Sequence, residues 1–125
     1  MATISYLTTA QFDFGAIRLV SQECVRLGIR HPLIVTDKGI RAAGLLDKLQ
    51  EALDASLGFD VFDETPPNPT EAATLSALAR YRAVAADGVI AVSHFTRDAL
   101  VRTFGVPPSK VTLISNGVDL SRFRP

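Results

Sequence analysis

The sequence lacks the features of a disulfide-stabilised or nucleic-acid-binding protein. Its single cysteine, Cys24, excludes an intrachain disulfide, and its helical context predicts a buried, inert thiol. Thirteen basic residues balance thirteen acidic ones, so no broad positive field exists to attract nucleic acid or anionic lipid. We therefore expect neither a nucleic-acid partner nor a membrane partner.

Long apolar runs and histidines are also scarce. No stretch approaches the roughly 20 apolar residues that span a bilayer, and no basic region followed by an apolar core opens the chain. These absences lead us to expect a cytoplasmic location. The two histidines, His31 and His94, lie on different predicted elements and cannot supply the three or four ligands of a transition metal. No iron or zinc site is predicted.

What the sequence does contain is an alternation of short apolar strands with amphipathic helices. The strands are expected at 11–14, 33–35, 59–62, 89–92 and 111–114, and the helices at 16–27, at 45–57, from 69 to about 81 and near 96–104. Strands separated by single helices need right-handed crossovers, which give a mainly parallel sheet covered on both faces. We therefore predict one three-layer α/β domain over residues 1–125, Rossmann-like or flavodoxin-like, with about five strands.

Polar residues follow two of the predicted strands. Asp37 follows the apolar run Leu33–Val35 after one residue, Thr36, in a segment, 36–39, that is expected to be a loop. A carboxylate at this place is a helix cap, a loop charge or a ligand contact. Further along, Asn68 is expected to cap a helix that begins at Pro69, with Glu71 as the reciprocal cap. The inward face of that helix is predicted to consist of Leu75, Leu78 and Ala79.

The first two-thirds of the chain resembles the iron-containing alcohol dehydrogenase family. The order and spacing of its motifs match the coenzyme-binding half of that family: Phe14-Gly15-Ala16, Leu33-Ile34-Val35-Thr36-Asp37-Lys38-Gly39, Ala43-Gly44-Leu45-Leu46, Val61-Phe62-Asp63-Glu64 and Pro67-Asn68-Pro69-Thr70. The resemblance implies that Asp37 contacts the adenosine ribose and that Asn68 and Pro69 border the nicotinamide cofactor. A carboxylate at the carboxyl end of a parallel strand can accept two ribose hydrogen bonds, which agrees with that role.

Residues beyond about 87 resemble a different family. They are similar to the end of the N-terminal domain of retaining two-Rossmann-domain glycosyltransferases (GT-B, family 4), through Asp87–Ser93, Gly105–Val111 and Asn116–Asp119. Both families have an Asp-Gly-Val-Ile-Ala-Val strand at this point, so a junction is expected between 82 and 92. We therefore predict a dehydrogenase-like part, 1–85, and a glycosyltransferase-like part, 87–125.

The turn after this shared strand departs from the dehydrogenase pattern. That family has Gly-Gly-Gly-Ser, whose bare backbone N–H groups approach the pyrophosphate, whereas this chain has Ser93-His94-Phe95-Thr96. Ser93 is then a vestigial cofactor contact, and nicotinamide dinucleotides are expected to bind weakly or not at all. The resemblance places the family's iron ligands in a following helical domain, which is not found in this sequence.

These observations favour an engineered chimera that folds but has no catalytic activity and no resident cofactor. Two alternatives remain. One is a residual nucleotide-binding module that uses Asp37, Asn68 and Ser93, and the other is a fragment of an alcohol dehydrogenase or glycosyltransferase that needs a second domain. Loss of a partner domain would expose apolar surface or a strand edge, so a tendency to form homodimers is also predicted.

Overall fold

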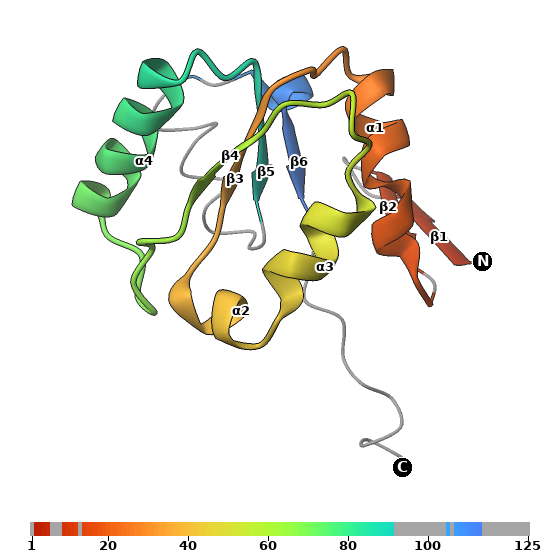
Figure 1. The fold of residues 1–125 in the computed structure, drawn as a ribbon, viewed down its shortest axis with the longest axis horizontal. Helices are drawn as coiled ribbons and strands as arrows, with labels where there is room; N and C mark the ends of the chain where they lie inside the picture. Colours follow the sequence, from red (N-terminus) through yellow and green to blue (C-terminus); the bar gives the residue numbers. More distant parts are fainter. Residues whose placement is uncertain (1, 6–8, 13, 92–104, 106, 114–125) are drawn as a thin grey trace.

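A four-stranded parallel sheet lies at the centre of the computed structural model, which describes residues 2–5, 9–12, 14–91, 105 and 107–113. Its strands are β3 (Pro32–Val35), β4 (Asp60–Phe62), β5 (Gly88–Ala91) and β6 (Val111–Leu113), in the spatial order β4-β3-β5-β6 (Figure 1). Val35 lies opposite Phe62 on one side and Ala91 on the other, so three strands end at one edge. This carboxyl edge is where ligands of open α/β sheets bind.

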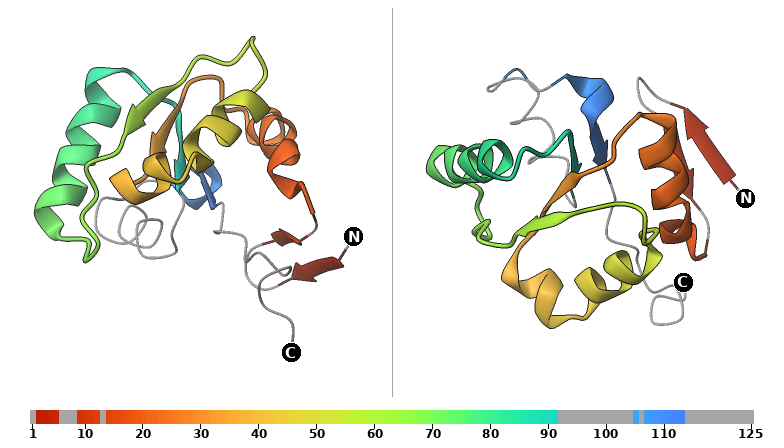
Figure 2. Two further views of the ribbon diagram at one scale, coloured as in Figure 1. Left: turned by 60° about the horizontal axis from the view of Figure 1, so that its bottom comes forward. Right: turned by 45° about the horizontal axis from the view of Figure 1, so that its top comes forward.

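Helices cover both faces of the sheet (Figure 2). A 3-10 turn, η1 (Ala16–Leu19), leads into α1 (Val20–Arg26), which shares one face with α3 (Leu45–Ala52). Helix α4 (Glu71–Ala83) packs on the opposite face. The short helix α2 (Lys38–Ala42) follows β3, and a second 3-10 turn, η2 (Pro108–Lys110), precedes β6.

Alternate residues of the central strands point into two separate apolar clusters. Leu33, Val35, Val89 and Ala91 pack on the α4 side, whereas Ile34 and Ile90 pack against α1 and α3. Each of these side chains is at most 1% exposed. Strands buried on both faces in this way are typical of parallel sheets. The predicted α/β class, with a parallel sheet between helical layers, is therefore confirmed.

The N-terminal strands lie outside the parallel sheet. Strands β1 (Ala2–Ser5) and β2 (Thr9–Phe12) pair with each other in antiparallel register and lie beside α1 (Figures 1 and 2). The strand expected at 11–14 therefore has different bounds and a different partner, because alternation within a strand does not reveal which sheet it joins. With four strands found in the parallel sheet of the described residues, the expected number of about five is not confirmed.

Two helical predictions need correction around α2 and α3. Residues 38–42 are helical instead of forming a loop, and Gly44 separates α2 from α3 in a left-handed conformation, with φ of 73°. Helix α3 then ends at Ala52, earlier than predicted, although Leu53 and Leu57 remain buried. Ser21 of α1 explains this end, because its Oγ donates to the Ala52 carbonyl at 2.9 Å and accepts from the Asp54 backbone at 2.7 Å.

The inward face predicted for α4 is also wrong. Leu75 is 49% exposed and Ala79 is exposed, whereas Thr74 and Ala77 are buried against the sheet. Apolar residues occur all around this helix, so their spacing does not identify the buried side. Packing against β3 and β5 selects it instead.

No helix among the described residues is long and apolar enough to cross a bilayer. The cytoplasmic location stays a prediction.

Candidate functional site

Asp37 lies at the carboxyl edge of the sheet, in the connection from β3 to α2. Its Oδ1 accepts a hydrogen bond from the backbone N–H of Ile40 at 2.8 Å, so the side chain caps α2. The residue is half-buried, and within the described part of the chain no group donates to its second oxygen, Oδ2. Of the roles open to this carboxylate, the cap is present in the structure, and ligand binding through Oδ2 stays a prediction.

Thr36 precedes Asp37 and carries a buried hydroxyl. Its backbone N–H donates to the Phe62 carbonyl at 2.8 Å and so extends the pairing of β3 with β4. The residue is 1% exposed, and its Oγ1 has no hydrogen-bond partner among the described residues. A buried hydroxyl without a partner costs free energy of folding. Thr36, which carries this cost, is the immediate neighbour of Asp37 in the chain. Sequence reasoning did not single out Thr36, because only its burial distinguishes it.

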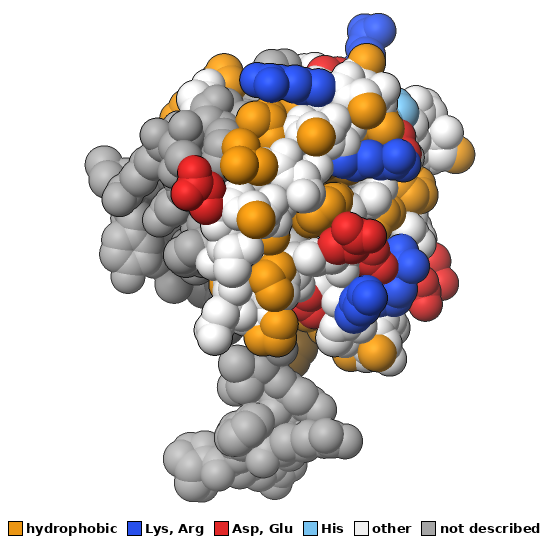
Figure 3. All heavy atoms as spheres, turned by 90° about the vertical axis from the view of Figure 1, so that its left-hand side faces the viewer, with side chains coloured by type: hydrophobic (Ala, Val, Ile, Leu, Met, Phe, Trp, Pro, Cys, Tyr) orange, Lys and Arg blue, Asp and Glu red, His pale blue; other side chains and the backbone are white. Residues whose placement is uncertain are grey.

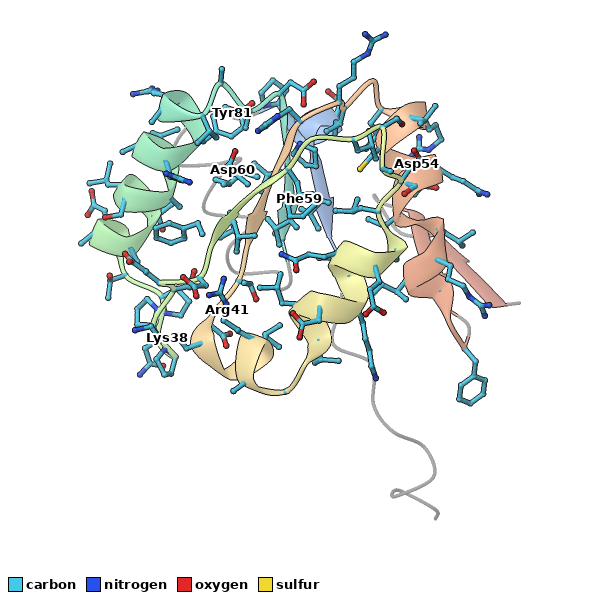
Figure 4. All side chains as sticks on the ribbon, viewed as in Figure 1. Lys38, Arg41, Asp54, Phe59, Asp60 and Tyr81 are labelled. Atoms are coloured by element: carbon cyan, nitrogen blue, oxygen red, sulfur yellow. The ribbon has the colours of Figure 1, made fainter. Side chains whose placement is uncertain are left out.

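Arg41 and Asp63 form an ion pair at the same edge. Arg41 lies on α2 one helical turn after Asp37, and its backbone N–H donates to the Asp37 carbonyl at 3.2 Å. Its Nε lies 3.1 Å from Oδ2 of Asp63, the residue that follows β4. Figure 4 shows Arg41 and the exposed Lys38 below the sheet, both carried by α2. Asp37, which follows β3, and Asp63, which follows β4, thus each interact with α2, the helix that carries Lys38 and Arg41.

The start of α4 reaches the carboxyl edge from the other face of the sheet (Figure 1). The cap of this helix is Thr70, whose Oγ1 accepts from the backbone N–H of Ala73 at 3.2 Å. The predicted cap at Asn68 is therefore wrong, and Pro69 precedes the helix instead of opening it. Asn68 is exposed and Pro69 is half-buried, so both are accessible from solvent at the edge where Asp37 lies.

Ser93, the remaining predicted contact, lies outside the described residues, as does His94. Strand β5 ends at Ala91, directly beside the end of β3. The structure therefore brings Asp37 and the Asn68–Pro69 segment to one edge of the sheet. Their role in binding a cofactor stays a prediction.

A second polar cluster lies at the opposite, amino edge of the sheet, and sequence reasoning missed it. Nε2 of His31 is 2.9 Å from Oδ2 of Asp60, and Arg80 donates to Oδ1 of the same carboxylate at 2.8 Å. The hydrogen bond with His31, helped by Arg80, lowers the pKa of Asp60. The three residues are separated by 29 and 20 positions, so no local pattern connects them.

Asp87 closes the same edge from the start of β5. Its two carboxylate oxygens accept hydrogen bonds from the backbone N–H groups of Arg30 and His31, at 2.9 and 2.8 Å. The amino ends of β3, β4 and β5 are thus held together by charged groups. This cluster is structural and lies on the side of the sheet away from Asp37.

Cys24 and the acidic residues offer no further reactive site in the described part of the chain. Cys24 is fully buried, as predicted, and burial together with the negative charges of Asp87 and Glu23 raises its pKa to about 11. It is therefore a protonated thiol at neutral pH. No group of three or more His, Cys, Asp or Glu side chains that could hold a metal occurs among the described residues. The expected absence of a metal site stays a prediction.

Comparison with known proteins identifies relatives for most of the chain. The family model of iron-containing alcohol dehydrogenase matches residues 8–92. The chain is 54% identical over 94 residues to 4-hydroxybutyrate dehydrogenase of Cupriavidus necator, covering 74% of this chain and 24% of that protein. It is 30% identical over 99 residues to lactaldehyde reductase of Escherichia coli, covering 78% of this chain and 26% of that protein. This chain thus spans about a quarter of the length of these relatives.

Solved structures agree. The crystal structure of 1,3-propanediol oxidoreductase superimposes with a TM-score of 0.59 at 34% identity, covering 62% of this chain and 21% of that one. Maleylacetate reductase from Agrobacterium tumefaciens shares the fold over 83% of this chain and 29% of its own length, with a TM-score of 0.66 and 23% identity.

These similarities overturn the prediction of an engineered chimera without enzymatic function. The relatives are enzymes, and none of the matches described above is to a glycosyltransferase. The alignment with choline dehydrogenase of Bacillus subtilis, at 29% identity, covers 83% of this chain. An alignment of that length is longer than the segment 1–92 and so passes the junction that was expected between 82 and 92. The glycosyltransferase interpretation rested on short motifs, which were not sufficient to establish a change of family.

Proposed function

Because this chain belongs to the iron-containing alcohol dehydrogenase family, we propose that it supplies the dinucleotide-binding part of an alcohol dehydrogenase. The observation that carries the proposal is the position of Asp37, at the carboxyl end of β3 and beside β5. Ligands of open α/β sheets bind outside the carboxyl ends of the strands, and a carboxylate there accepts hydrogen bonds from ribose hydroxyls.

The reaction proposed for the whole protein is hydride transfer between a primary alcohol and a nicotinamide dinucleotide. In the oxidation direction, the carbinol C–H bond breaks, the hydride joins the nicotinamide ring and the hydroxyl proton is released, which gives an aldehyde, NADH and a proton. Relatives named 4-hydroxybutyrate dehydrogenase and 1,3-propanediol dehydrogenase favour a short alcohol with a second polar end. Since this chain spans about a quarter of those relatives, both the substrate and the activity belong to the proposal.

In this proposal, each of the two carboxylate oxygens of Asp37 has its own role. Oδ1 stays bound to the Ile40 backbone and holds the carboxylate in one orientation. Oδ2 faces no donor among the described residues and accepts hydrogen bonds from the ribose. Asn68 and Pro69 border the cofactor from the start of α4, and Ser93 does so two residues beyond the end of β5.

The iron in the family's name has no fitting ligand set among the described residues, where no three His, Cys, Asp or Glu side chains gather. No step of the proposed reaction is therefore assigned to a metal here. The residues of this part of the chain bind and orient the dinucleotide.

Titration of the full chain with NAD⁺ and with ADP-ribose, followed by backbone NMR, tests the proposal. We expect shifts centred on Asp37 and Ile40 with both ligands, because ADP-ribose retains the adenosine ribose. The turn Ser93–Thr96 lacks the family's glycines, so the dissociation constant is expected in the millimolar range.

Two substitutions make this test specific. Asp37→Ser keeps a side chain that caps a helix but removes the carboxylate, so α2 persists while binding weakens about tenfold or more. Asp47→Ser removes an exposed acid from α3 and leaves binding unchanged. The proposal is rejected if the chemical-shift changes do not include Asp37. It is also rejected if no changes occur at ten millimolar ligand, which is on the order of tenfold above the expected dissociation constant.

A further inference from the structure

The ion pair between Arg41 and Asp63 lies where a phosphorylated dinucleotide would differ from an unphosphorylated one. In dinucleotide-binding α/β folds, an acidic residue after the strand selects a free ribose 2′-hydroxyl, whereas a nearby arginine accommodates a 2′-phosphate. This chain has both residue types, since Arg41 follows Asp37 by one helical turn. Which dinucleotide is preferred therefore depends on what Arg41 contacts.

Arg41 is directed toward this edge by helix geometry. Residues four apart lie on the same side of a helix, and side chains lean toward the helix N-terminus. The guanidinium of Arg41 thus returns toward the start of α2, and its Nε meets Oδ2 of Asp63 at 3.1 Å. Asp63 follows β4, which pairs directly with β3, so the carboxylate that holds Arg41 belongs to the strand next to the one that Asp37 follows.

The Asp63 side chain is more buried than that of Arg41, so we regard Asp63 as the fixed member of the pair. The Asp63 side chain is 23% exposed, and that of Arg41 is 54% exposed. A half-buried carboxylate gains more from a fixed partner than an exposed guanidinium does. Arg41 can exchange partners at moderate cost, and an anionic ligand competes with Asp63 for the guanidinium.

We propose that Asp63 is a specificity-determining residue that withholds Arg41 from a 2′-phosphate, so that the site takes dinucleotides with an unmodified adenosine ribose. The inference rests on the proposed function and names the cofactor class of the same site. Asp63 acts through Arg41 and does not itself need to touch the ligand. A 2′-phosphate would have to compete with Asp63 for an arginine that is already paired.

The test compares 5′-AMP with 2′,5′-ADP (adenosine 2′,5′-bisphosphate) on the full chain, because these probes differ only in the 2′-phosphate. Dissociation constants are measured by NMR titration, with the Nε signal of Arg41 as a local reporter. The wild-type chain is expected to prefer 5′-AMP. Asp63→Asn, which is close in shape, is expected to shift the ratio of the two constants by up to about fivefold toward 2′,5′-ADP, the range that follows from loss of a partly exposed ion pair.

Three variants separate this explanation from a simple change of charge. The double variant Asp63→Asn with Arg41→Gln removes the freed guanidinium and is expected to lose the shift. Glu64→Gln removes the exposed neighbouring acid and is expected to leave the ratio unchanged. Arg41→Lys keeps the charge but lacks the Nε donor that meets Asp63, so it moves the ratio in the same direction as Asp63→Asn and serves if that variant does not fold.

The outcomes distinguish the inference from the function on which it rests. If 5′-AMP perturbs Asp37 but the ratio stays constant in Asp63→Asn and Arg41→Lys, the role of Asp63 is wrong and the nucleotide site stands. If the double variant keeps the shift, loss of negative charge explains it and the inference is overturned. If neither probe perturbs Asp37 in any variant, both the site and the inference are rejected.

Discussion

The Asp60 carboxylate binds two basic side chains at the amino edge of the sheet. It accepts from His31 and from Arg80, and its pKa is lowered mainly by the hydrogen bond with His31. A carboxyl whose pKa is lower in the folded than in the unfolded chain stabilises the fold above its unfolded value, near 4. That contribution is lost as the pH falls through the folded pKa.

We predict that Asp60→Asn lowers the free energy of unfolding at pH 7 by about 1 kcal/mol or less, since the partners are partly exposed. The difference from the wild type shrinks as the pH falls below about 4, where the wild-type carboxylate becomes protonated. Urea unfolding at a series of pH values measures it. Glu64→Gln, in an exposed acid, is the control and changes little. A difference that stays constant down to pH 2 would contradict this account.

At the scale of elements, the two ends of α4 differ in how well their residues suit the backbone. Thr70 caps the start, and the end closes with a hydrogen bond from Ala86 N–H to the Tyr81 carbonyl and one from Ala85 N–H to Arg82. Helix α1 ends in the same pattern, but with Gly28 where α4 has Ala85. Among the described residues, Ala85 is the one residue other than glycine with a left-handed φ, 53°.

Thr70→Ala is expected to lower the free energy of unfolding by about 1 kcal/mol, because the Ala73 N–H loses its partner. Asn68→Ala, at the position that the sequence favoured as the cap, is expected to change it by only a few tenths of a kcal/mol. Chemical unfolding of the two variants ranks them directly. The reverse order would mean that Asn68 caps the helix in solution.

Ala85→Gly is expected to stabilise the chain by about 0.5–1 kcal/mol, because glycine adopts the left-handed conformation without strain. Ala83→Gly, two residues earlier and inside α4, is the matched control and destabilises by a similar amount. Thermal or urea unfolding reports both. Destabilisation by both glycines would show that Ala85 is unstrained.

The sequence of residues 93–96, which follow β5 in the chain, sets the expected strength of dinucleotide binding. Replacing Ser93-His94-Phe95-Thr96 with Gly-Gly-Gly-Ser would let backbone N–H groups approach a pyrophosphate, each worth roughly 1–3 kcal/mol to a charged acceptor. We predict a gain in NAD⁺ affinity of at least about tenfold by calorimetry. A variant in which only His94 and Phe95 become alanine tests removal of bulk alone. Micromolar binding by the unmodified chain would refute this view of the turn.

At the scale of the whole molecule, the outer face of α4 carries several exposed apolar side chains. Leu75 is 49% exposed, and Ala72, Ala79 and Ala83 are exposed on the same helix. Figure 3 shows apolar side chains scattered over this side of the molecule, between separate charged groups. Leu75 is the large apolar side chain among those exposed on α4, so it is the residue at which we test for association.

We predict weak dimerisation at high protein concentration, reduced by Leu75→Lys. Light scattering over a concentration series measures the molar mass. Val25→Lys, which alters another exposed apolar side chain on α1, serves as the control and leaves association unchanged. A strict monomer at millimolar concentration would contradict the prediction, and equal effects of both variants would place the contact elsewhere.

The sequence by itself determined the class of fold and the motifs that carry the family resemblance. Strand and helix periodicity are local properties, so β3 and β5 were predicted to within one residue of their bounds. The helix predicted from residue 16 begins as the 3-10 turn η1 and becomes α1 only at Val20. The segment from Leu33 to Gly39 likewise identifies Asp37 as the residue at the strand end. Local patterns were also the source of the main error, because short motifs beyond residue 87 were interpreted as a second family, whereas the family model of iron-containing alcohol dehydrogenase extends to residue 92.

Only the tertiary structure decided how distant segments meet. It placed β1 and β2 outside the parallel sheet and buried the Thr36 hydroxyl without a hydrogen-bond partner among the described residues. It also brought Ser21 of α1 to the end of α3, where its hydroxyl binds the Ala52 carbonyl. It also paired Arg41 with Asp63. Each of these features depends on strand register and helix packing between residues far apart in the chain. Propensity and spacing describe neighbours in sequence, and therefore cannot specify such contacts.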